Sequence, residues 1–143
     1  MEKMKKIIYL LILTLVLCNI TLASTYSEIN KVAKDLKGTT DIETINNVED
    51  FVLNNFTYKF SYRRRSIYKI WKTKTLDCTG RALLSRKLLS KNKIKIRIVR
   101  GYVGNKTHYN IKHDWIEYRL NNTWISKEKQ YFDRIRKTGY GIW

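Results

Sequence analysis

The chain has 143 residues, and its 29 lysine and arginine residues outnumber 12 acidic ones, for a formal net charge of +17. This length suffices for one domain with a modest hydrophobic core and excludes a two-domain protein. The positive charge would suit an anionic polymer as a partner, but a solvated basic surface explains it equally well.

The first 23 residues have the layout of a targeting segment. Lysines precede a largely apolar run, residues 7–23, which closes with a small-x-Ala pattern at Thr21-Leu22-Ala23. This layout predicts a secretory signal peptide. An uncleaved anchor is the alternative, because the run would span about 26 Å as a helix, slightly less than a hydrocarbon core of about 30 Å. Both interpretations put residues 24–143, the single predicted domain, outside the cytoplasm, as a secreted or surface protein.

Two amphipathic helices are predicted after the targeting segment. Apolar residues recur at helical spacing over residues 27–36, and Gly38 follows them. Thr40-Asp41-Ile42-Glu43 has the pattern of a capping box, and a one-sided apolar face continues from it to Phe56. The next stretch is aromatic and basic, and residues 66–72 within it are compatible with a short helix.

Cys78 is predicted to lie in the first turn of a central helix. Asp77 is a suitable N-cap, and the apolar residues over 82–89 occupy more than half of the helix circumference. A thiol at a helix N-terminus faces unpaired N–H groups and the positive end of the helix dipole, which favour the nucleophilic thiolate. The structural alternative is that Cys78 is a small buried core residue, which is the commoner role of a lone cysteine.

The other cysteine, Cys18, lies in the targeting segment, so Cys78 has no partner for an internal disulfide in residues 24–143. Such a domain would keep 26 basic and 11 acidic residues, a net charge of about +15. A single cysteine in an exported protein either pairs with another chain or remains a reactive thiol. The helix-start position favours the reactive thiol.

The apolar period changes from 3.6 to 2 beyond Asn92, which indicates strands. The tail over residues 130–143 is aromatic and basic and shows no clear pattern. Helices followed by a strand meander predict an α+β domain. The predicted elements of the meander are a half-solvated strand over 94–99 that ends at Gly101 and Gly104, a second strand over 111–120, a turn at Asn121-Asn122 and a third strand over 123–127.

The chain has two histidines, His108 and His113. They are five residues apart, so on one continuous strand they would face opposite ways, and at most one would face the cysteine helix. His113 lies in the better-patterned part of the strand. A Cys–His pair needs a third group that orients the imidazole, and Glu128 is the only acid of the following segment. A zinc site of these residues with Cys78 is the alternative, but no C-x-x-C or H-x-x-x-H pattern occurs, so we predict no metal and no cofactor.

Several motifs follow one another in order over residues 48–128. They are Asn55-Phe56-Thr57-Tyr58, Asp77-Cys78-Thr79, Val99-Arg100-Gly101-Tyr102 and His113-Asp114-Trp115-Ile116-Glu117. These motifs resemble N-F-x-Y, G-D-C-T, V-x-G-Y and H-A-W-V-E of the transglutaminase-like superfamily. Trp124 also resembles the tryptophan four residues ahead of that family's catalytic aspartate.

The resemblance implies a papain-like fold, in which a helix presents the cysteine against an antiparallel sheet that presents histidine and acid. It makes Cys78 the nucleophile, His113 the general base and Glu128 the third catalytic member. The family usually has aspartate followed by proline at this third position, so Asp133 is the fallback. Leu76 stands where the family usually has glycine.

The predicted activity is that of a small exported cysteine enzyme that acts on an amide or isopeptide bond of a peptide or protein, with a cell-envelope peptide as one candidate. The family includes proteases and crosslinking enzymes. No acidic cluster suggests a calcium site, so we expect hydrolysis. Trp71 and Trp115 are tentative substrate contacts, and for Trp115, as for Trp124, a core position is the other interpretation.

The alternative function is a non-catalytic surface module that binds anionic envelope polymers through its basic face, including Arg63-Arg64-Arg65. Basic residues interleaved with aromatic ones also suit nucleic acid, but export argues against nucleic acid as the main partner. Contact with a membrane is expected only through the N-terminal segment.

Overall fold

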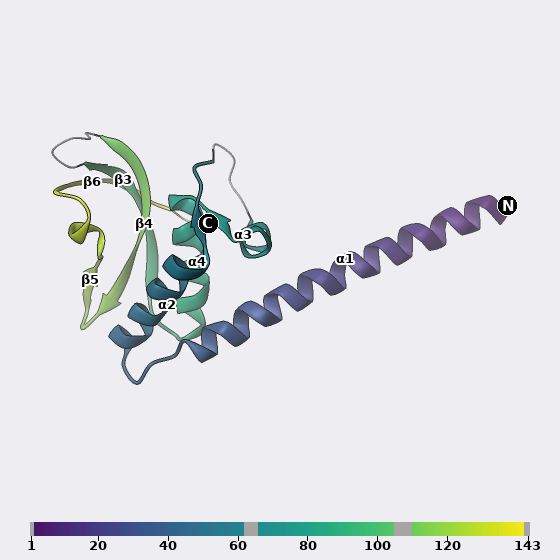
Figure 1. The fold of residues 1–143 in the computed structure, drawn as a ribbon, viewed down its shortest axis with the longest axis horizontal. Coiled ribbons are helices and arrows are strands. Elements are labelled where there is room, and N and C mark those ends of the chain that lie inside the picture. Colours follow the sequence, from purple (N-terminus) through teal and green to yellow (C-terminus); the bar gives the residue numbers. More distant parts are fainter. Residues whose placement is uncertain (1, 62–65, 105–109, 142–143) are drawn as a thin grey trace.

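The computed structural model describes residues 2–61, 66–104 and 110–141, so His108 and the arginine run at 63–65 lie outside the described residues. A four-stranded antiparallel sheet has helices on one side, which is the predicted α+β class (Figure 1). The helices are α1 (Glu2–Asp35), α2 (Asp41–Asn55), α3 (Ile67–Thr73), α4 (Cys78–Lys91) and the short 3-10 helix η1 (Glu128–Gln130). The strands are β1 (Thr57–Tyr58), β2 (Thr75–Leu76), β3 (Ile96–Gly104), β4 (Ile111–Leu120), β5 (Thr123–Ile125) and β6 (Arg134–Gly141).

Helix α1 runs without a break through both the apolar segment and the first predicted amphipathic helix. Its N-terminal half is exposed and projects from the rest of the molecule (Figure 1), and it is long and apolar enough to cross a membrane. Its C-terminal half belongs to the domain, because Thr25, Ile29 and Ala33 are fully buried there. The hydrophobic core therefore begins directly after the predicted targeting segment, with no linker between them.

Side-chain caps set the starts of α2 and α4 where the sequence predicts them. The Thr40 hydroxyl accepts a hydrogen bond from the Glu43 amide at 3.2 Å, and the Glu43 carboxylate reaches back to the loop before the helix. The Asp77 carboxylate accepts from the Gly80 amide at 2.8 Å. This N-cap makes Cys78 the first residue of α4.

Helix α4 is the central helix of the domain. It packs on β3 and β4 with one side and on α1, α2 and α3 with others. Leu84, Leu88 and Leu89 are fully buried, and each such side chain contributes roughly 1.5–3 kcal/mol to stability. The prediction of a helix covered on several sides is confirmed.

The large sheet has the strand order β5-β4-β3-β6, and its two central strands are buried on both faces. Ile98 pairs with Ile116 and packs in the main core with α4. Val99 pairs with Trp115, and these two form a second cluster on the opposite face with Phe132 and others. The half-solvated strand predicted over 94–99 holds for Lys95, which is exposed, but not for Val99, because β6 and the segment before it cover that part of the second face.

The ends of β3 and β5 compare differently with the predicted meander. Strand β3 ends at Gly104, one of the two glycines predicted to end it, and a bulge between Arg100 and Gly101 shifts its register with β6. A Cβ atom at Gly101 would overlap the carbonyl oxygen of Arg136, so this close approach requires glycine. Strand β5 ends at Ile125 rather than at residue 127.

Strand β4 has the predicted bounds, and the turn after it is the predicted one. Asn121 and Asn122 both have positive φ, 46° and 64°, as a two-residue hairpin requires. Strand β5 pairs with β4 only through Tyr118–Leu120. Among the described strands, none pairs with β4 along that edge before Tyr118, and this is where η1 and the start of α4 approach it.

Candidate active site

Cys78 lies at the start of α4, facing β4, and its side chain is half-buried. The first turn of α4 is tied to the sheet, because the Thr79 hydroxyl donates to Asp114 at 2.8 Å. Asp114 also accepts two hydrogen bonds from Arg100, at 2.9 and 3.2 Å. Burial opposes ionisation of Asp114, but the bonds from Arg100 and Thr79 hold the pKa of its carboxyl below the ordinary value.

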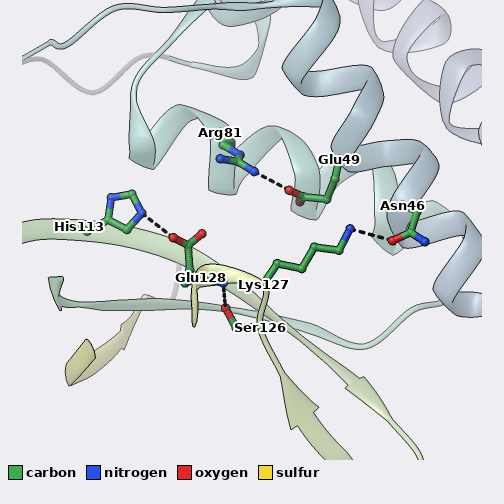
Figure 2. Close-up of polar contacts among 7 residues, drawn as sticks. All are labelled: Asn46, Glu49, Arg81, His113, Ser126, Lys127 and Glu128. Atoms are coloured by element: carbon green, nitrogen blue, oxygen red, sulfur yellow. Dashed lines mark hydrogen bonds and ion pairs between the residues drawn. The ribbon is translucent and has the colours of Figure 1, made fainter. Parts of the chain in front are cut away.

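His113 lies beside Cys78 and contacts Glu128. Its Nε2 atom is 3.2 Å from the Glu128 carboxylate (Figure 2), which leaves Nδ1 as the ring nitrogen for the thiol. The ring stacks on Trp115 with centroids 6.0 Å apart, and Phe132 meets it edge-on at 5.4 Å. Two aromatic walls and a carboxylate therefore fix the plane of the imidazole.

Cys78 and His113 shift one another's pKa values in opposite directions. Burial would raise the pKa of the Cys78 thiol, but hydrogen bonds from the His113 ring and the Asp114 backbone, with the positive charge of His113, lower it overall. Burial would lower the pKa of His113, but hydrogen bonds to Cys78 and Glu128 and their charges raise it to about 9. A thiolate–imidazolium pair is thus favoured from the lowered Cys78 pKa up to about pH 9.

Glu128 is 9% exposed and begins η1, the turn that follows β5. Its backbone N–H donates to the Ser126 hydroxyl at 3.0 Å, and the adjacent Lys127 ammonium donates to Asn46 of α2 at 2.7 Å (Figure 2). These contacts anchor the backbone at Glu128 and at the residue before it. The fallback acid, Asp133, is exposed, whereas Glu128 makes the contact with His113.

Arg81, one turn along α4 from Cys78, forms an ion pair with the buried Glu49 of α2 at 2.6 Å (Figure 2). Burial disfavours the charge of Arg81, but Glu49, with a smaller effect from Glu128, raises the pKa of its guanidinium. Arg81 also borders a void of about 20 Å³ with Cys78, His113 and Glu128. The ion pair therefore fastens α2 to the back of the site.

Tyr58 reaches the cysteine from β1. Strand β1 pairs in parallel with β2, and this register sets Tyr58 beside Leu76, just before α4. Burial, together with the charges of Cys78 and Asp77, raises the pKa of the Tyr58 hydroxyl.

A hollow of about 280 Å³ opens over Cys78 and His113. It is large enough for a side chain or a short stretch of a peptide. The other residues that line it are Phe60, Ser61, Asp77, Thr79, Arg100, Lys112 and Asp114.

The two tryptophans predicted as tentative substrate contacts are both buried. Trp71 is 2% exposed and stacks on Phe51 in the main core, with ring centroids 6.1 Å apart. Trp115 is 3% exposed and lies under the His113 ring. Neither is among the residues that line the hollow over Cys78, so a direct substrate contact stays a prediction for both.

Sequence reasoning missed the partners that hold the site together. Asp114 lies beside His113 in the strand motif. An acidic residue is unusual in a buried strand, and this is the one sign in the sequence that Asp114 has a partner. Arg81 and Asn46 gave no signal, because their partners are 32 and 81 residues away.

The chain matches the family model described as the transglutaminase-like superfamily over residues 30–128. No curated protein sequence matches it. Among solved structures it is similar to a candidate cysteine protease from Cytophaga hutchinsonii, with a TM-score of 0.65 and 18% identity over 80% of this chain and 42% of that one.

Two further structures share the fold. A candidate protease from Parabacteroides distasonis has a TM-score of 0.56 and 19% identity over 71% of this chain and 23% of that one. A TGase has a TM-score of 0.55 and 11% identity over 71% of this chain and 29% of that one. The chain thus spans less than half the length of each of the three, and at these identities the likeness concerns the fold alone.

Proposed function

Because the chain belongs to the transglutaminase-like superfamily, we propose that it is a cysteine enzyme that cleaves an amide or isopeptide bond through a thioester on Cys78. The observation that carries this proposal is that Cys78, at the start of α4, lies next to His113, which in turn contacts Glu128. Cys78 is the nucleophile, His113 the acid and base, and Glu128 the group that orients and stabilises the imidazolium.

The reaction begins from the thiolate–imidazolium pair. The Cys78 thiolate attacks the carbonyl carbon, and His113 then donates its Nδ1 proton to the nitrogen of the leaving amine as the C–N bond breaks. In the second half, His113 takes a proton from water, the hydroxide attacks the thioester, and the thiolate leaves. An amine in place of water would give acyl transfer. We propose hydrolysis, because the hollow over the half-buried Cys78 is open to solvent.

A thiol-labelling experiment tests the nucleophile. In the folded full-length protein, the rate of iodoacetamide modification at Cys78, followed by mass spectrometry of its peptide, should already be high well below the ordinary thiol pKa of about 8.5. The reason is that His113 and the Asp114 backbone stabilise the thiolate. The same protein unfolded in urea is the matched control. A folded-state rate that rises only near pH 8.5 would remove the nucleophile assignment.

We further propose that the domain works outside the cytoplasm, delivered there by the apolar half of α1. When the full chain is expressed in cells, added protease should digest the domain without lysis, or the product should be processed near Ala23. A cytoplasmic marker protein that stays intact serves as the control. A full-length product found only in the cytosol would contradict export.

A further inference from the structure

A row of basic and aromatic side chains crosses the sheet beside the hollow over Cys78. Lys112 of β4, Tyr102 of β3 and Arg136 of β6 are in register on three adjacent strands. Together with Arg100, two residues along β3, they form what we call the basic shelf. The guanidinium of Arg136 lies 4.9 Å from the centre of the Tyr102 ring, so these two side chains share a face of the sheet.

The basic shelf is on the same face of the sheet as the cysteine helix. Asp114 contacts Thr79 of α4, and Lys112 lies two residues earlier on the same strand, so its side chain points to the same side. Arg100 and Lys112 also line the hollow that contains Cys78. A molecule bound to the thiol would therefore meet this row directly.

A second hollow of about 310 Å³ lies next to the basic shelf. Tyr102, Arg134 and Arg136 are among its lining residues. Tyr102 is the register partner of Lys112, which lines the first hollow, so the linings of the two hollows include neighbouring residues of β3 and β4. They offer an extended chain a path from the thiol across the ends of three strands.

Among the described residues that line the two hollows, the charged side chains that face solvent are all basic. The acids that line them, Asp77 and Asp114, are both engaged, one as the cap of α4 and the other with Thr79 and Arg100. Lys112 and Arg136 are exposed. Phe60, 63% exposed, adds an apolar surface at the rim of the first hollow.

We propose that the basic shelf is a specificity site that binds acidic side chains of the peptide substrate, close to the amide that Cys78 attacks. The assignment rests on the proposed hydrolase function and names its substrate class, an acidic peptide. A basic peptide is disfavoured by the same charges. Because the cations are exposed, each contributes modestly, and two together are expected to give about a tenfold preference at low salt.

The test compares matched peptides on the full-length protein. Fluorogenic peptides share one scissile amide and carry glutamate, its isostere glutamine, or lysine at each of the flanking positions in turn. The ratio of kcat/KM for glutamate over glutamine is expected to be about ten at the best position and to fall towards one at high salt. The double variant Lys112→Gln/Arg136→Gln should bring this ratio close to one at low salt.

A matched control removes the same charge elsewhere. Lys95 and Arg119 are exposed and line a different hollow, at the other end of the sheet. The variant Lys95→Gln/Arg119→Gln should keep the glutamate preference. A wild-type ratio near one, or a ratio lost equally in both double variants, would overturn the basic shelf as a specificity site.

Binding to the inert Cys78→Ala variant separates this proposal from the hydrolase function. A glutamate peptide that binds more tightly than its glutamine isostere, with the difference lost in the Lys112/Arg136 variant, supports the shelf whether or not any peptide is cleaved. If iodoacetamide does not label Cys78 in the folded protein and no peptide is cleaved, the hydrolase function is contradicted. Polyglutamate binding would also be measured in the presence of the short peptides. If the short peptides do not compete with it, the basic shelf binds a polymer instead, and the proposal is overturned.

Discussion

Replacing His113 by alanine is expected to lower kcat/KM for any cleaved peptide by about four orders of magnitude or more. The substitution removes the proton carrier and the positive charge that stabilises the Cys78 thiolate. The fold should survive, because the neighbouring strand residues Trp115 and Ile116 remain packed in their two clusters. Turnover, urea unfolding and the pH dependence of Cys78 labelling would be measured together, and the labelling curve should shift to higher pH.

The other histidine is the natural control for this experiment. His108→Ala should change kcat/KM much less, since His113 already occupies the position between Cys78 and Glu128. Equal losses in the two variants, or a larger loss in His108→Ala, would contradict the role given to His113.

Replacing Glu128 by glutamine is expected to reduce turnover by up to about 10⁴-fold, because an amide can present its N–H₂ group to Nε2 and stabilise the wrong imidazole tautomer. The pH profile is the more specific readout. The Glu128 carboxylate helps to raise the pKa of His113 to about 9, so its neutralisation should move the alkaline limb of kcat/KM to lower pH. A wild-type rate with an unmoved alkaline limb would exclude Glu128 and direct attention to Asp133.

Glu128→Asp asks whether the chain has adapted to the longer side chain. The Glu128 carboxylate lies 3.2 Å from Nε2 with its backbone anchored by Ser126. Aspartate is one methylene shorter and would withdraw the carboxylate by about 1.5 Å, beyond hydrogen-bond range. We therefore expect Glu128→Asp to impair turnover, although aspartate is the usual residue of the family. Full activity in this variant would mean that the backbone after β5 moves.

The parts of the fold that the sequence predicts well are those set by local interactions. Asp77 caps the helix three residues ahead, so the start of α4 and the place of Cys78 follow from neighbouring residues alone. The bounds of β4 are likewise clear, since Asn121-Asn122 supplies the positive φ angles that end the strand. Strand patterning favours His113, and Glu128 is the only acid of the following segment, but their catalytic roles follow from the family resemblance.

The parts that the sequence misses depend on distant partners. Strand β6 is rich in arginine and glycine, and it is a strand because β3 offers it an edge across a bulge at Gly101. Val99 belongs to the strand predicted to be half-solvated, and it is buried because Phe132 and Ile135, more than 30 residues away, cover it. Glu128 lies in a 3-10 turn beyond the end of β5, and the anchoring of that turn to Asn46 spans most of the domain.

The unbroken course of α1 fixes the relation between the domain and whatever holds its N-terminal half. Thr25, Ile29 and Ala33 lock the helix into the core immediately after its apolar part, so the helix contains no joint. If α1 stayed in a bilayer, it would connect the domain to the membrane rigidly. Cys78 would then be held at a fixed distance and in a fixed orientation above the lipid. If the chain were cleaved after Ala23, the retained helix would begin at Ser24, one residue before its first buried side chain, Thr25, and the domain would diffuse freely. Cleavage of this helix would therefore determine whether the domain meets its substrates at a membrane surface or in solution.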